Sequence, residues 1–109
     1  MTEQVPALVW CPFHDSEEAH KAASVLLAEN YIACANIIPA MQSIYEWQGE
    51  VTSSAEIGVL FKTTALQIEG LIARLGECHP YDTPAITAWN CDAAHPATMQ
   101  WLCGTVGNG

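Results

Sequence analysis

The chain has 109 residues, of which 50% are hydrophobic, and its three Lys and Arg residues against twelve Asp and Glu residues give a formal net charge of −9. This length and apolar content predict a single globular domain, residues 1–109, with one core and no room for a second domain. The negative charge makes nucleic acid and anionic membranes poor partners, while it serves solubility and raises the local concentration of cations.

The N-terminal residues lack the basic region, apolar run and small-residue cleavage site of a secretory signal, and no apolar segment approaches 18 residues. We therefore expect a soluble, cytoplasmic protein. The five cysteines are an odd number without Cys-x-x-Cys spacing, which fits neither a disulfide framework nor a structural zinc site. Most of them are expected to be buried, reduced thiols.

The first two predicted elements are a strand and a helix. Ala7 to Cys11 is a continuously apolar run ended by Pro12, which is typical of a central strand covered on both faces. Asp15 offers an N-cap, with Glu18 as its capping-box partner, to a helix that reaches Asn30. Apolar residues recur at helical spacing, at Ala19, Ala22, Ala23 and Leu26, and the small alanines among them predict a close approach to the sheet.

A long hairpin follows, from Ala33 to Thr64. The Gln48-Gly49 pair between two β-favouring runs predicts a tight turn. The second strand, Glu50 to Lys62, would be about 43 Å long at 3.3 Å per residue, whereas a compact domain of this size is only about 34 Å across. The hairpin should therefore project beyond its own core and be covered by copies of the same chain. Pro39 cannot donate to a strand ladder, so it predicts a bulge or an edge position.

The second half of the chain predicts two helices and a strand. Thr64 and Gln67 form a second potential capping box, opening an amphipathic helix that ends near Gly76. The two prolines of HPYDTP at 79–84 fix a rigid loop before a last strand at Ala85 to Trp89. Pro96 then opens a short helix through Leu102. The alternation along the hairpin's second strand predicts its core-facing residues, which are Ile57, Val59 and Phe61.

The order β, α, β, β, α, β with a closing helix predicts an α+β fold, the ferredoxin-like sandwich of an antiparallel sheet with helices on one face. An ordered set of residues at particular separations carries a further resemblance. Its members are Cys11, the run Ala33 to Pro39, Ser43, Tyr45, Trp47, Gly49, Glu56, Lys62-Thr63-Thr64, His79-Pro80-Tyr81, Thr83-Pro84 and Trp101. From about Ala7 to Leu102, the chain resembles the CutA family of divalent-cation tolerance proteins.

The resemblance implies a homotrimer in which three long hairpins wrap around one another, similar to the PII signalling proteins. It also implies tolerance to copper and other divalent cations, with copper held by a Cys at the end of the first strand, a His just before His-Pro-Tyr, and a Glu directly after Thr-Pro. Cys11 matches the first position, whereas Cys78 and Ala85 occupy the other two.

We therefore expect an altered metal site made of Cys11, Cys78 and His79, because thiolate and imidazole ligands suit Cu(I) or zinc. Copper or another divalent cation would be the ligand, and folding would not require it. The alternative is that Cys11 and Cys78 are buried apolar side chains and that His79 caps its own loop.

The second candidate site lies on the hairpin. Tyr45 and Trp47 share a strand face, as do Glu56 and Lys62, so all four could line a cleft between subunits. Lys62, close to the predicted helix start at Thr64, would favour a small anionic ligand, as in a PII-like signalling module. The alternative is that Glu56 and Lys62 pair across subunits and that Tyr45 and Trp47 anchor the interface.

The sequence shows no clear catalytic site, and we expect a binding protein that is not an enzyme. Cys11 and His79 are the only nucleophile and base worth testing as a pair. An acylphosphatase-like hydrolase of this topology would need a phosphate-binding Arg near the first strand. The only arginine, Arg74, lies inside the second predicted helix.

Overall fold

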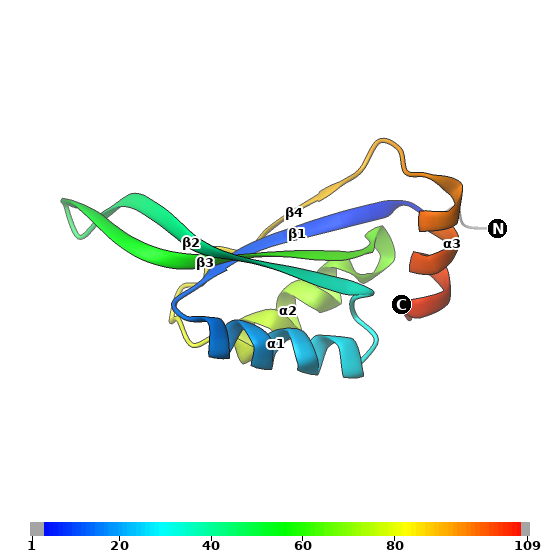
Figure 1. Cartoon of the computed structure of the whole chain (residues 1–109), viewed down its shortest axis with the longest axis horizontal. Helices are drawn as coiled ribbons and strands as arrows, with labels where there is room; N and C mark the ends of the chain where they lie inside the picture. The colour runs from blue at the N-terminus through cyan, green and yellow to red at the C-terminus, as the bar shows by residue number, and fades with distance from the viewer. Residues whose placement is uncertain (1–3, 108–109) are drawn as a thin grey trace.

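The computed structural model describes residues 4–107 and shows a four-stranded antiparallel sheet, in the order β2-β3-β1-β4, with α1 and α2 packed on one face (Figure 1). The elements in chain order are β1 (Pro6–Phe13), α1 (Ser16–Ala28), β2 (Cys34–Trp47), β3 (Glu50–Thr64), the 3-10 turn η1 (Ala65–Gln67), α2 (Ile68–Cys78), β4 (Thr87–Asn90) and α3 (Pro96–Thr105). This order confirms the predicted α+β, ferredoxin-like fold with a long hairpin and a closing helix.

The hairpin of β2 and β3 extends well past the helices, at the end of the molecule opposite α3 (Figure 1). Gln48 and Gly49 have φ of 51° and 82°, the left-handed conformations that a two-residue hairpin turn requires. β3 has 15 residues, and the molecule measures 49 Å along its longest axis but only 26 and 22 Å across. Val51 remains 82% exposed on the projecting arm. The overhang predicted from the sequence is therefore confirmed.

Pro39 lies at a break in the pairing between β2 and β3. The register shifts between Ile38 and Met41, and Ala40 has a φ of 59°. Two residues of β2 thus have no direct partner on β3. The ladder therefore does not require a hydrogen bond from Pro39, which has no N–H. This confirms the predicted bulge.

The sequence suggested that Pro12 ends the first strand. This prediction is wrong, because β1 continues through Phe13. The N–H of Cys91 donates to the Pro6 carbonyl, so even-numbered residues of β1 direct their backbone polar groups toward β4. β4 pairs only with residues 7–10 of β1, and it has therefore ended before Pro12 is reached. Proline is tolerated there because no ladder partner needs its N–H.

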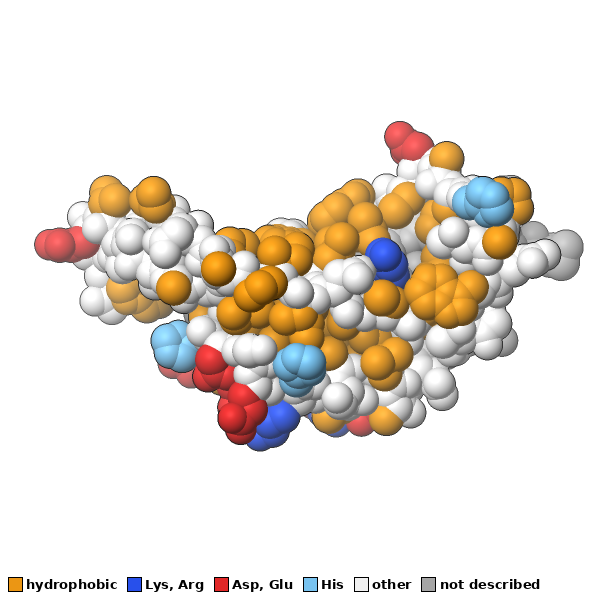
Figure 2. All heavy atoms as spheres, viewed as in Figure 1, with side chains coloured by type: hydrophobic (Ala, Val, Ile, Leu, Met, Phe, Trp, Pro, Cys, Tyr) orange, Lys and Arg blue, Asp and Glu red, His pale blue; other side chains and the backbone are white. Residues whose placement is uncertain are grey.

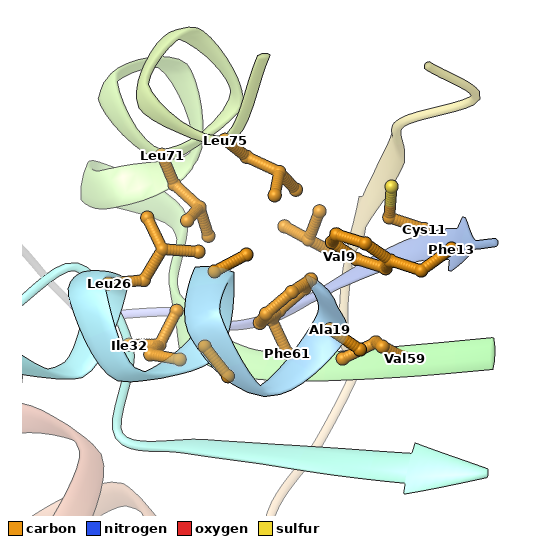
Figure 3. Close-up of a cluster of buried hydrophobic side chains, with 12 residues drawn as sticks. Val9, Cys11, Phe13, Ala19, Leu26, Ile32, Val59, Phe61, Leu71 and Leu75 are labelled. Carbon is orange, nitrogen blue, oxygen red and sulfur yellow. The ribbon is translucent and has the colours of Figure 1, made fainter. Parts of the chain in front are cut away.

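One face of the sheet packs on α1 and α2 to form the core. Side chains from β1, β3 and both helices point toward one another, with Phe61 near the middle and Cys11 at the edge (Figure 3). Phe13, Phe61 and Leu26 are completely buried. The core positions predicted on β3 are correct, since Val59 and Phe61 are fully buried and Ile57 packs against the cluster.

The opposite face of the sheet, which we call the open face, carries apolar side chains and lies away from α1 and α2. Strand register places the residues of this face together, and they are Leu8, Trp10, Ile38, Met41, Leu60 and Trp89. Figure 2 shows hydrophobic side chains gathered over the strands and along the hairpin. β1 is therefore a central strand, as predicted, but only its core face is fully buried within residues 4–107.

Of the two predicted helix caps, one is confirmed and one is wrong. The Asp15 carboxylate accepts a hydrogen bond from the Glu18 N–H at 2.8 Å. The Thr64 side chain makes no cap bond, and its buried hydroxyl has no partner among residues 4–107. Gln67 instead donates to the Gly107 carbonyl at 2.6 Å, because the segment after α3 lies within reach of its amide. A 3-10 turn therefore replaces the capping box.

Two predicted boundaries also shift. α2 continues to Cys78, two residues beyond the expected end near Gly76. β4 begins at Thr87 and not at Ala85. No helix within residues 4–107 is both long and apolar enough to cross a membrane.

Candidate functional site

A concave site lies where the hairpin arm leaves the body of the sheet. It has a volume of about 620 Å³, within the range of small-molecule sites. The hairpin, the end of β1 and the loop before β4 all line this site, which we call the arm groove. Its lining residues are Pro12, His14, Ser43, Tyr45, Trp47, Ser54, Glu56, Tyr81, Asp82, Thr83 and Ala85.

The hairpin contributes one face of the arm groove by strand alternation. Tyr45, Trp47 and Glu56 all lie on the face of the hairpin turned away from the core. The sequence predicted this face for Glu56, and for Tyr45 and Trp47 only that they share a face. The Tyr45 hydroxyl lies 3.4 Å from the Ser54 hydroxyl, a diagonal contact between the strands, since Tyr45 pairs directly with Thr52. Three of the four predicted cleft residues therefore line the same groove.

Lys62, the fourth predicted cleft residue, does not line the arm groove. It pairs with Cys34 and Leu8 near the far end of β3, six residues from Glu56, or roughly 20 Å along the strand. Lys62 could lie beside the other three residues only if it came from a neighbouring subunit. The assignment of Lys62 to an intersubunit cleft stays a prediction.

Tyr81 closes the arm groove from the loop side, and sequence reasoning did not include it among the site residues. Its hydroxyl donates to the Glu56 carboxylate at 2.8 Å. Burial, together with this hydrogen bond and the charge of Glu56, raises the pKa of Tyr81 above its usual value and keeps the phenol protonated as a donor. The HPYDTP motif marked a rigid loop, but only the folded chain shows which strand residue the loop meets.

His79, a predicted metal ligand, is 6% exposed and uses both ring nitrogens within the fold. Its Nε2 lies 2.9 Å from the Pro12 carbonyl, and its Nδ1 lies 3.1 Å from the Tyr81 N–H. These partners require Nε2 to donate and Nδ1 to accept, so the ring is neutral. The imidazole also stacks on Phe13 with ring centroids 4.2 Å apart.

Cys11, the second predicted metal ligand, is completely buried at the edge of the core. Its thiol lies 3.6 Å from the same Pro12 carbonyl that His79 contacts. Burial, with a smaller contribution from the Glu56 charge, raises the pKa of the Cys11 thiol to about 12. A protonated thiol is neither a strong metal ligand nor an activated nucleophile, which argues against a catalytic Cys11 and His79 pair.

Cys78, the third predicted ligand, is the last residue of α2 and faces different surroundings. It lines a small hollow of about 210 Å³ with α1 residues, including Lys21 and Glu18. His79, the next residue, has extended backbone angles and turns toward Pro12. The structure thus brings Cys11 and His79 to one carbonyl oxygen but leaves Cys78 elsewhere. Within residues 4–107, no group of three or more His, Cys, Asp or Glu side chains is arranged to hold a metal ion.

Acid should destabilise the metal-free protein through His79. Burial lowers the pKa of His79 in the folded chain below the 6.5 of a free imidazole, although the Pro12 hydrogen bond partly opposes this effect. Folding therefore favours the neutral ring, and its stabilising effect is complete above about pH 6.5 and lost as the pH falls below it. Urea unfolding between pH 7.5 and 5.5 should show this loss in the parent protein and a weaker pH dependence in His79→Gln.

His20→Gln provides the matched control, because His20 is exposed on α1. It should keep the full pH dependence of the parent protein. An unchanged pH dependence in His79→Gln would contradict the assignment to His79.

A family model and individual relatives point to the same family of proteins. Residues 7–105 match the family model described as CutA1 divalent ion tolerance protein. The chain is 37% identical over 95 residues to the divalent-cation tolerance protein CutA of Pyrococcus horikoshii, covering 87% of this chain and 92% of that one. It is 30% identical over 108 residues to the chloroplastic protein CutA of Arabidopsis thaliana, covering 98% of this chain and 59% of that one.

Solved structures agree with the sequence matches. The crystal structure of CutA1 from Oryza sativa superposes with a TM-score of 0.92 at 26% identity, covering 97% of this chain and 98% of that one. The corresponding protein from Ehrlichia chaffeensis, named a divalent ion tolerance protein, gives a TM-score of 0.90 at 29% identity, with coverages of 95% and 97%.

Proposed function

Because this chain belongs to the CutA1 divalent ion tolerance protein family, we propose that it acts in the tolerance of divalent cations as a homotrimeric metal-binding protein with copper as its ligand. Family membership over residues 7–105 is the observation that carries this proposal. The net charge of −9 supports it, because an acidic surface concentrates cations. The protein would bind and not transform its ligand, and it would work in the cytoplasm, although the Arabidopsis relative is named chloroplastic.

The open face and the hairpin arm support self-association. Trp89 and Ile38 are 47% and 45% exposed on the open face, and Ile44 is 76% exposed on the arm. Exposed apolar side chains that gather in this number are more often part of an interaction site than of a solvated face. Copies of the same chain are the simplest cover, since symmetric self-assembly would bury all the equivalent surfaces at once.

A copper site at Cys11, Cys78 and His79 would require each of these three residues to change from its state in the single chain. Cys11 would have to lose a proton that burial holds tightly. His79 would have to release Pro12 or Tyr81, and Cys78 would have to turn away from α1. Each change costs free energy, so binding should be weaker than at a preformed site and should release protons. The residues as they stand do not form a ready-made copper site.

Titration of the reduced protein with copper tests the proposal. Binding should be stoichiometric, with one ion per chain, and Cys11→Ser should weaken it by at least tenfold because the thiolate ligand is lost. Cys91→Ser is the matched control, since Cys91 lies at the end of β4, outside the predicted set, and should leave binding unchanged.

A dissociation constant no tighter than about 100 μM, corresponding to roughly −5.5 kcal/mol, would remove copper from the proposed function. Equal weakening in the two serine variants would instead point to non-specific thiol binding.

The alternative of a PII-like signalling module binding a small anion has less support. The arm groove has the size of a ligand site, but Glu56 and Asp82 line it and would repel an anion. Lys62, which was expected to attract one, lies outside the groove of its own chain. An anion site would therefore need Lys62 from a neighbouring subunit.

A further inference from the structure

The arm groove combines aromatic rings with carboxylates and contains no basic side chain of the Lys or Arg type among its eleven lining residues. Three aromatic side chains line it, Tyr45 and Trp47 from β2 and Tyr81 from the opposing loop. Two carboxylates, Glu56 and Asp82, also line it. This composition would complement a positive charge carried by an apolar group.

Glu56 supplies a negative charge to this groove. Its side chain is half-buried, and it forms no ion pair with any residue in the range 4–107. The Tyr81 phenol is the group that donates a hydrogen bond to one carboxylate oxygen and fixes its position. A fixed carboxylate without a cation is a costly arrangement that a bound cation would relieve.

The aromatic rings decide which kind of cation fits. Aromatic faces attract ammonium groups, and sites for quaternary ammonium ligands are built from such rings. A bare divalent ion needs several ligands at close range, and no group of three or more His, Cys, Asp or Glu side chains among residues 4–107 is arranged to hold one. A groove of about 620 Å³ is also far larger than a single ion requires.

We propose that the arm groove is a binding site for a small organic cation of the alkylammonium class. Glu56 is the counter-ion, Tyr81 positions Glu56, and Tyr45 and Trp47 pack against the alkyl groups next to the charged nitrogen. The inference does not rest on copper binding or on the Cys11 and His79 region.

Choline and its neutral isostere 3,3-dimethyl-1-butanol test the proposal directly, because they share a shape and differ in charge. In calorimetric titrations of the full-length assembled protein at low salt, choline should bind with a dissociation constant of about 1 mM or tighter. The neutral isostere should bind at least tenfold more weakly. Raising the ionic strength should weaken the binding of choline alone.

Variants then identify the groups responsible. Glu56→Gln keeps the shape and an acceptor for Tyr81 but removes the charge, and it should weaken choline binding at least tenfold. Trp47→Leu should weaken it about two- to fivefold, as expected for loss of an exposed cation–π contact. Glu50→Gln is the matched control, since Glu50 lies opposite Trp47 on β3 but does not line the groove, and it should change nothing.

Three results would overturn the proposal. The first is that choline does not bind at 10 mM, which is expected if another subunit fills the groove. Equal affinity for the neutral isostere is the second, and equal effects of Glu56→Gln and Glu50→Gln are the third. None of these results bears on copper binding, which is measured in a separate titration.

Discussion

Replacing Phe61 with alanine should lower the free energy of unfolding by about 3–5 kcal/mol, the usual loss when a large aromatic side chain is removed from a packed core. Phe61 is completely buried, and its neighbours on the paired strands are Val9 and Ala35. Helices α1 and α2 cover it from the other side, so the cavity could not fill with solvent (Figure 3). Urea unfolding monitored by circular dichroism would measure the change.

Leu27→Ala is the control for this effect, because Leu27 is an apolar residue exposed on α1. Its removal should change the free energy of unfolding by no more than about 0.5 kcal/mol. A loss below 1 kcal/mol for Phe61→Ala would mean that the cluster around this residue does not carry the stability of the fold. Both variants must be compared at one protein concentration, since assembly adds to apparent stability.

Replacing Leu60 with glutamate should convert the proposed trimer into a monomer. Leu60 lies on the open face, directly opposite Trp10 on β1 and Asn36 on β2. In an assembly that buries this face, the new carboxylate would be desolvated without a partner, which costs several kcal/mol per chain. Native mass spectrometry should show three times the 11.8 kDa chain mass for the parent protein and the single chain mass for the variant.

The same substitution at Leu27 separates this effect from a general effect of added charge. Leu27→Glu changes the net charge equally but lies on the outer surface of α1, and it should leave the trimer intact. A Leu60→Glu protein that still forms trimers would show that the open face is not the contact between subunits. A parent protein that is monomeric would refute the trimer itself.

Local sequence signals predicted the parts of the fold that depend on neighbours along the chain. The Gln48-Gly49 turn, the bulge at Pro39 and the Asp15 cap each follow from backbone restrictions or short-range hydrogen bonds. The same kind of signal was misleading at Thr64 and Gln67. There a residue 40 positions away, Gly107, provides the acceptor that displaces the expected cap.

In the candidate sites, too, local sequence signals predicted some features, and long-range contacts decided the others. Strand alternation was sufficient to place Tyr45 and Trp47 on one face of their strand, since the period of two is a property of each strand. That Glu56 of the next strand shares this face follows from the strand register, which includes the bulge. Alternation could not show that Tyr81 reaches Glu56, because that contact depends on how a loop crosses the end of β1. Nor could residue types reveal that the partners of His79 leave neither ring nitrogen free.

By itself, the sequence determined the order of the elements, the length of the hairpin, the residues on each strand face and the family to which the chain belongs. These properties follow from periodicity, backbone chemistry and residue identity, all of which act over short stretches of chain. Only the tertiary structure decided that Pro12 lies within β1, that Cys11 is held protonated, and that the arm groove is acidic and aromatic. Those outcomes depend on strand ends, burial and long-range contacts, which arise only when distant segments pack together.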